Sequence, residues 1–80
     1  MFTVYILRDS TGKLYKGMTG DLVRRLREHI SGQTRTTRKM QNLKVVYTEV
    51  FQTLEEARKR ERYFKSAGGR RYLKTKLIGV

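Results

Sequence analysis

The distribution of apolar and polar positions along the chain predicts three β-strands. Residues 2–8 are apolar, β-branched or aromatic at nearly every position, as is typical of a buried strand. Residues 9–12 have the composition of a turn, and residues 13–18 follow as a second short strand. The strongest β-forming stretch of the chain is residues 44–51.

The length of the first turn decides which side chains of the hairpin share a face. A three-residue loop with Gly12 in the left-handed region gives a type I turn plus a bulge. In that register Tyr5 pairs with Gly17 and Leu7 with Tyr15, so the two tyrosines lie on one face. A four-residue loop would instead place the tyrosines on opposite faces.

Helical spacing appears after the hairpin. Asp21 is the expected N-cap of a helix in which Leu22, Leu26 and Ile30 form an apolar stripe at i, i+4 and i+8. The Ser31-Gly32 pair is expected to end this helix.

Two further helices are expected in the last third of the chain. Thr53 and Glu56 form a capping box, which predicts a helix running to about Ala67 and stopped by Gly68-Gly69. A last short helix is expected over Arg70–Ile78.

The order of these elements is ββαβαα, which predicts a single α+β domain over residues 1–80. Its three-stranded antiparallel sheet would be flanked by helices, and residues 33–42 would form a polar loop without periodicity. The chain has no cysteine, so disulfides and thiolate zinc sites are excluded. The apolar runs are shorter than a membrane span and no export signal is visible, so we expect a soluble, cytoplasmic protein.

Positive charge dominates the composition. Nineteen Lys and Arg residues stand against seven Asp and Glu residues, a formal net charge of +12 on 80 residues. A polyanionic partner would relieve the resulting self-repulsion, and nucleic acid is the leading candidate. A membrane partner is not expected, because no helix has a clean basic face opposite an apolar one. The alternative is a small domain that is simply basic.

One acidic residue interrupts an apolar stripe. Glu61 lies between the directions of Leu54 and Ala57, on the side of the second long helix that should face the core. A carboxylate in that position costs several kcal/mol unless it is paired, protonated or bound to a cation. The pattern therefore indicates a functional site, unless Arg58 or Lys65 neutralises the carboxylate from the same helix.

The first helix carries a second pair of candidate residues. Arg25 and His29 are i, i+4 neighbours and share a face beside Leu22 and Leu26. Considered alone, Arg25 can be explained as an ordinary surface charge, and His29 as a histidine packed in the core without a catalytic role.

These residues occur together in an order that resembles the GIY-YIG nuclease family. Val4-Tyr5-Ile6 and Tyr15-Lys16-Gly17 stand where the family has its two tripeptides. Gly17–His29 is similar to the family pattern G-x-T-x-D-L-x-x-R-L-x-x-H. Ala57–Lys65 is similar to the A-x-x-x-E-x-x-x-K helix of the small stand-alone members.

The sequence also departs from the family pattern. Val4 replaces the first glycine, and Lys16 replaces an aliphatic residue in the second tripeptide. Many members carry a late asparagine, whereas the only asparagine of this chain is Asn42, in the expected loop. The separate DNA-binding domains of the larger enzymes have no counterpart here.

The resemblance implies a catalytic role for five residues. Tyr5 would be the general base toward the attacking water, and Tyr15 would orient water or phosphate. Arg25 would stabilise the charge that develops on phosphorus-bound oxygens, and His29 would assist Tyr5 or contact phosphate. Glu61 would hold the metal. Because a phenol has an ordinary pKa near 10, nearby cations would have to lower the pKa of Tyr5.

The acidic residues favour a single metal ion. Glu61 is the only carboxylate expected to face the sheet, while Glu28 and Glu49 have no obvious partner. One Mg²⁺ (or Mn²⁺) held by Glu61, water and substrate phosphate fits the preference of this cation for retaining most of its water.

Basic residues outside this group are expected to contact the phosphates of DNA, with RNA not excluded. They are Lys16, Arg35, Arg38, Lys39, Arg70, Arg71 and Lys74. The chain is thus predicted to be a Mg²⁺-dependent endonuclease, acting on DNA of structured or damaged form. The alternatives are a catalytically weak or inactive nucleic-acid-binding module of the same fold, and a basic interaction domain of a ribonucleoprotein. A monomer and a weak dimer are both compatible with the sequence.

Overall fold

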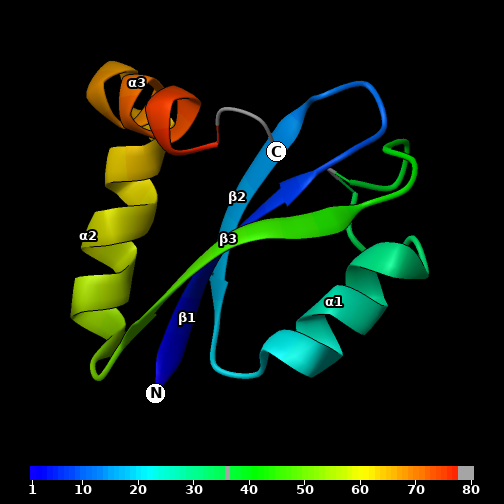
Figure 1. The fold of residues 1–80 in the computed structure, drawn as a ribbon. Coiled ribbons are helices and arrows are strands. Elements are labelled where there is room, and N and C mark those ends of the chain that lie inside the picture. The colour runs from blue at the N-terminus through cyan, green and yellow to red at the C-terminus, as the bar shows by residue number, and fades with distance from the viewer. Residues whose placement is uncertain (36, 78–80) are drawn as a thin grey trace.

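In the computed structural model of this chain, a three-stranded antiparallel sheet lies between one helix on one face and two helices on the other (Figure 1). The structure describes residues 1–35 and 37–77. The elements are β1 (Phe2–Arg8), β2 (Leu14–Thr19), α1 (Leu22–Ile30), β3 (Lys44–Phe51), α2 (Leu54–Lys65) and α3 (Ala67–Lys76). The strand order is β2-β1-β3, so β1 is central and β2 and β3 are the edges. The predicted α+β class and the order ββαβαα are confirmed.

The two faces of the sheet pack against different helices. Val4 and Ile6 of β1 are fully buried with Ala57 and Phe64 of α2 and Leu73 of α3. Side chains alternate along a strand, so the neighbours of Val4 and Ile6 point to the other face, where α1 lies (Figure 1). None of the helices in the described part of the chain is long and apolar enough to cross a membrane.

The β1–β2 turn has the three-residue loop. Gly12 adopts a φ of 91°, and the amide of Asp9 donates to the carbonyl of Lys13 at 3.0 Å. The Asp9 carboxylate accepts from the amides of Thr11 and Lys13 at 2.9 and 2.8 Å, which fixes the turn. Tyr5 therefore pairs with Gly17, as the three-residue alternative requires.

Helix α1 begins as predicted but buries a different residue at its end. The Asp21 side chain accepts from the amide of Arg24 at 3.1 Å, as an N-cap should. Ile30, expected in the apolar stripe, is 73% exposed, whereas His29 is 2% exposed. The prediction that Ile30 belongs to the buried apolar stripe was wrong, because α1 is oriented with His29, rather than Ile30, facing the sheet.

The boundary between α2 and α3 also differs from the prediction. Helix α2 begins at the expected capping box, but it ends at Lys65, and Ser66 caps the next helix through the amide of Gly69. The pair Gly68-Gly69 was expected to stop a helix and instead lies in the first turn of α3. A Cβ on Gly69 would come within 1.8 Å of the Tyr63 carbonyl oxygen, so close helix–helix packing explains this glycine. The last residue of the helix predicted over Arg70–Ile78 lies outside the described residues.

Candidate active site

Four of the five candidate residues lie together on the α1 face of the sheet. Tyr5 comes from the central strand, Tyr15 from the edge strand β2, and Arg25 and His29 from α1. The ring centroids of Tyr5 and Tyr15 are 6.2 Å apart, and those of Tyr15 and His29 are 4.9 Å apart. The hairpin register places the two tyrosines on one face, and one turn of α1 separates Arg25 from His29. Tyr5 and His29, 24 positions apart in the sequence, therefore come into contact.

The centre of this group is a buried hydrogen bond. The phenolic oxygen of Tyr5 lies 2.8 Å from Nε2 of His29, and the two residues are 1% and 2% exposed. Gly17 makes room for the phenol, because a Cβ there would come within 2.6 Å of the Tyr5 oxygen and 3.0 Å of the Tyr15 ring. The glycine of the second tripeptide thus has a steric role in this chain.

Arg25 supplies the positive charge of the site. Its guanidinium donates to Glu28 at 2.9 Å and also interacts with the phenols of Tyr5 and Tyr15. These interactions, with Glu28 first, raise the pKa of Arg25 above its ordinary value. Glu28, expected to have no obvious partner, therefore holds Arg25 against the two phenols.

The electrostatics of Tyr5 correct one expectation. Burial raises the pKa of Tyr5 to about 12, although hydrogen bonding to Arg25 acts in the opposite direction. The cation was expected to lower the pKa below that of a free phenol. Desolvation outweighs it because the phenolate would lose more hydration in this buried position than one guanidinium restores.

His29 is neutral at neutral pH. Burial, followed by the positive charge of Arg25, lowers the pKa of His29 below its ordinary value of 6.5. A guanidinium can only donate, so the Tyr5 oxygen accepts from Arg25, and its contact with Nε2 of His29 is compatible with either ring tautomer. Nδ1 lies 2.7 Å from Oγ1 of Thr37, whose hydroxyl can accept from a protonated Nδ1 or donate to an unprotonated one.

Glu61 lies on α2, which packs on the other face of the sheet from α1 (Figure 1). Its carboxylate is 3.6 Å from the ammonium of Lys65, the i+4 pair considered as a neutralising contact in the sequence. The Glu61 side chain is 22% exposed, so water and solutes reach it. The structure therefore brings together Tyr5, Tyr15, Arg25 and His29, with Glu61 across the sheet from them.

The two flanks of α2 face different strands. On one flank, Arg60 makes a two-pronged ion pair with Glu49 of β3 at 2.7 and 3.1 Å, so Glu49 also has a partner that the sequence did not reveal. On the other flank, Lys65 lies near Lys16 of β2, since burial and then the charges of Arg70 and Lys65 lower the pKa of Lys16. Lys65, the partner of Glu61, thus lies beside the edge strand β2, whose opposite face carries Tyr15.

The predicted phosphate-contacting residues form two groups. Lys16 is half-buried beside α3, where the exposed Arg70, Arg71 and Lys74 lie. Arg35, Arg38 and Lys39 are exposed in the loop that follows α1. The first group lies on the Glu61 side of the sheet, and the loop of the second group contacts His29 through Thr37.

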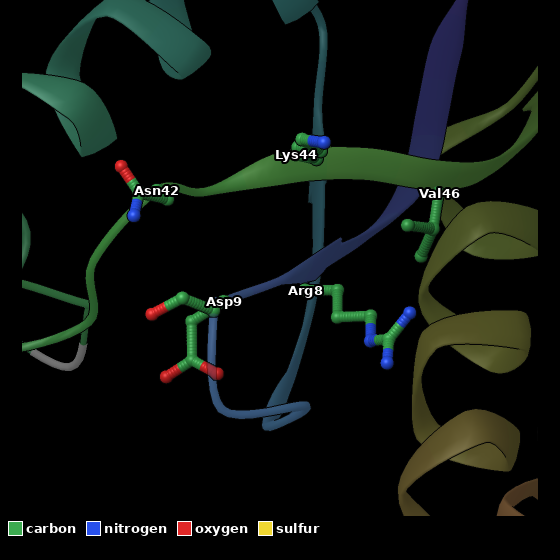
Figure 2. A pocket seen from close by; sticks show the side chains of 6 residues that line it. Arg8, Asp9, Asn42, Lys44 and Val46 are labelled. Carbon is green, nitrogen blue, oxygen red and sulfur yellow. The ribbon is translucent and has the colours of Figure 1, made fainter. Parts of the chain in front are cut away.

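Two hollows lie beside these elements. A cavity of about 590 Å³ is lined by Arg8, Asp9, Ser10, Asn42, Lys44 and Val46, with Arg8 and Val46 pointing toward the neighbouring helix (Figure 2). None of the five candidate residues lines it. A smaller cavity of about 260 Å³ is lined by His29 of α1 together with loop residues that include Arg38.

The roles of three residues of the site were not expected from the sequence. Thr37 lies in a polar loop without periodicity, so nothing in its spacing marked it as buried. Glu28 was recognised only as an acid without a partner, although its i+3 spacing from Arg25 was a usable signal. The steric role of Gly17 follows only from the hairpin register.

Comparison with known proteins identifies the class. Residues 1–74 match the family model described as the GIY-YIG catalytic domain, and the chain belongs to this family. A UPF0213 protein of Streptococcus agalactiae serotype V is 40% identical over 63 residues, covering 78% of this chain and 72% of the relative. A UPF0213 protein of Staphylococcus saprophyticus is 35% identical over 72 residues, covering 89% and 88%.

A solved structure of a UPF0213 protein has a similar fold. The solution NMR structure of a UPF0213 protein from Bacillus halodurans is 34% identical and matches with a TM-score of 0.60, over 99% of this chain and 88% of that one. The family resemblance drawn from the tyrosine tripeptides and the Gly17–His29 segment is thus confirmed. Membership of this family supports a nuclease function.

Proposed function

We propose that this protein is a divalent-metal-dependent endonuclease that hydrolyses phosphodiester bonds of DNA. The observation that carries the proposal is the buried hydrogen bond between Tyr5 and His29, held beside the Arg25 guanidinium. It combines a proton acceptor, a proton donor and a fixed positive charge within one hydrogen-bonded group. Phosphodiester hydrolysis needs such groups for the attacking water and for the charge on the phosphoryl oxygens.

The proton path starts at the water. The Tyr5 oxygen takes a proton from the attacking water while its own proton passes to Nε2 of His29, which becomes an imidazolium. This relay avoids a free phenolate, which a phenol with a pKa of about 12 would form only at very high pH. Tyr15 is half-buried and forms the accessible side of the pair, so it orients the water or a phosphate oxygen.

Arg25 stabilises the transition state. As the oxygens around phosphorus gain charge, its planar guanidinium donates two parallel hydrogen bonds, which a lysine ammonium does not provide. Glu28 keeps the guanidinium in place before substrate arrives. A preorganised donor of this kind is worth about 10²–10³ in rate.

The donor set fits one Mg²⁺ or Mn²⁺. In the described part of the chain, no three His, Cys, Asp or Glu side chains lie close enough to form a metal cage. Mg²⁺ needs only one or two protein carboxylates when substrate phosphate and water complete its shell. Glu61, partly exposed and 3.6 Å from the ammonium of Lys65, would supply that carboxylate. The ion would neutralise charge on the phosphate and the leaving oxygen.

The position of β2 at the sheet edge explains how two faces could serve one phosphate. Tyr15 and Lys16 are consecutive in this strand, so their side chains point to opposite faces. A phosphodiester lying across the edge would have Tyr15 and Arg25 on one side and Glu61 on the other. Lys16 and the basic residues of α3 would hold the flanking phosphates.

A catalytically weak nucleic-acid-binding module remains the second candidate. The burial of Tyr5 favours this alternative, because the side chain is 1% exposed and its raised pKa means that the phenol retains its proton. In that case the basic surfaces would bind nucleic acid and the buried tyrosine–histidine pair would be structural.

A nicking assay separates the two. Supercoiled plasmid and branched DNA are incubated with the purified protein in Mg²⁺, in Mn²⁺ and in EDTA. We expect metal-dependent nicking by the wild type, and loss of nicking with retained DNA binding in Glu61→Ala. Glu55→Ala, an exposed acid in the first turn of the same helix, is the control and should nick normally. Equal nicking by Glu61→Ala would point to another site, and binding without nicking in any metal would favour the binding module.

A further inference from the structure

Thr37 is the one residue of the basic loop that is fully buried among residues 33–35 and 37–42. It is 1% exposed, while Arg35, Arg38 and Lys39 on either side of it are exposed. Its hydroxyl lies 2.7 Å from Nδ1 of His29. A polar side chain buried between charged neighbours and aimed at a candidate site residue needs an explanation beyond the packing of the loop.

The hydrogen bonds of the two ring nitrogens are linked through the tautomer of His29. For His29 to take a proton from Tyr5, as the proposed relay requires, Nε2 must be unprotonated before the reaction. Nδ1 then carries the ring proton in a buried position and needs an acceptor, which the Thr37 hydroxyl can provide. The acceptor on the far side of an imidazole decides which ring nitrogen carries the proton, and here that acceptor is a threonine hydroxyl.

We propose that Thr37 is a positioning residue, which holds His29 in the tautomer that accepts the Tyr5 proton. Without the hydroxyl, Nδ1–H would lose its partner in a buried position, and the tautomer protonated at Nε2 would compete. In that tautomer His29 donates toward Tyr5 and no longer accepts from it. This inference rests on the proposed function, but the tautomer can be measured without any activity.

The same contact joins the loop to the site. The loop cations reach solvent, where a phosphate backbone would meet them, and Thr37 lies between them in the sequence. His29 and Arg38 also line the same cavity of about 260 Å³.

Nuclear magnetic resonance provides a test of the tautomer that is independent of activity. His29 is the only histidine of the chain, so its two ring nitrogens give an unambiguous signal. In the wild type near pH 7.5, we expect one protonated ring nitrogen, assigned to Nδ1, and one unprotonated, assigned to Nε2. In Thr37→Val, which keeps the shape and removes the hydroxyl, the two ¹⁵N shifts should converge as the tautomers mix. Thr37→Ser, which retains a hydroxyl, should restore the wild-type shifts.

Nicking rates give the second readout. Loss of an outer hydrogen bond to a functional histidine typically costs about 10–100-fold in activity. We expect a loss of that size in kcat for Thr37→Val, with little change in the affinity for DNA, and recovery in Thr37→Ser. Thr34→Val is the matched control in the same loop, because its buried hydroxyl has no hydrogen-bond partner among the described residues. It should leave the ¹⁵N shifts and the rate unchanged.

The outcomes are distinct. Wild-type ¹⁵N shifts in a folded Thr37→Val protein would overturn the inference, as would Thr37→Ser shifts that match those of Thr37→Val. If the wild type has no nicking activity, the proposed function fails while the tautomer comparison still decides the role of Thr37. If the wild type nicks and Thr37→Val nicks equally fast, the positioning role is wrong and the nuclease proposal stands.

Discussion

Oη of Tyr5 and Nε2 of His29 are 2.8 Å apart between two almost fully buried side chains, although the residues come from a strand and a helix. The contact depends on the three-residue turn, which places Gly17 opposite Tyr5. Because Gly17 has no side chain, the phenol can lie across β2 and reach α1. The geometry of the site is therefore set by the hairpin before the helix is added.

Gly17→Ala should damage both the fold and the site. The added Cβ would come within 2.6 Å of the Tyr5 oxygen, so the phenol must move away from His29. We expect a loss of about 1–3 kcal/mol in the free energy of unfolding, measured by urea denaturation. Gly20→Ala is the control, because a Cβ there would lie 3.8 Å from Phe2, an ordinary contact. Equal stability of the two variants would contradict the close packing at Gly17.

Stability should depend on the protonation of His29. Since the folded state lowers the pKa of His29, the unfolded chain binds the proton more readily. The free energy of unfolding should be constant above the ordinary pKa of 6.5 and should fall as the pH drops below it. One proton gives a slope of no more than about 1.4 kcal/mol per pH unit.

Urea unfolding between pH 7.5 and 5.5 measures this dependence. The chain has one histidine, so His29→Gln should remove most of the slope in this range. A slope that persists in His29→Gln would assign the effect to another group and would speak against a buried neutral imidazole.

Arg25→Lys should lower the nicking rate while the charge is conserved. A lysine ammonium cannot donate the paired hydrogen bonds of a guanidinium, and it would lose the joint contact with Glu28 and the phenols. We expect a decrease of about 10²-fold in kcat. Arg27→Lys, at an exposed position of the same helix, should nick at the wild-type rate. Similar rates for both variants would mean that Arg25 acts only through its charge.

DNA binding should depend steeply on salt, and two cations should account for a definable part of it. Each phosphate contact contributes about one unit to the slope of log K against log salt. Replacing Arg38 and Arg70 by glutamine should therefore reduce that slope by about 2. Arg62→Gln, an exposed position on α2, should leave it unchanged. Fluorescence anisotropy with labelled duplex between 50 and 200 mM salt measures the difference; an unchanged slope in the double variant would remove these two residues from the interface.

Much of the fold could be predicted because its signals are local. The limits of β1 and β3, the Asp21 cap and the capping box of Thr53 follow from neighbouring residues, and the structure has them where the pattern places them. The helix boundary at Ser66 could not be predicted in this way. The glycines after it suggested a stop, but the close contact of Gly69 with Tyr63 depends on how α3 packs on α2.

The site could be predicted only in part for a similar reason. The motif spacing marked Tyr5, Arg25 and His29, because the hairpin and the helical repeat place them on one face. The partner of His29 comes from a loop whose path depends on tertiary packing, so no periodic signal marked Thr37. The pKa of Tyr5 likewise depends on the balance between burial and one cation, which composition does not reveal.

The central claim is that groups on the two faces of β2 act on one phosphate, and a double-mutant cycle tests it. The variants are Arg25→Lys, Glu61→Gln and the two combined, and the measurement is the first-order rate of plasmid nicking at saturating protein in Mg²⁺. Residues that act as a unit are strongly non-additive. We predict that each single variant loses at least about 10²-fold and that the double variant is no slower than the slower single one. Losses that multiply in the double variant, or a Glu61→Gln protein as fast as the wild type, would contradict a shared site.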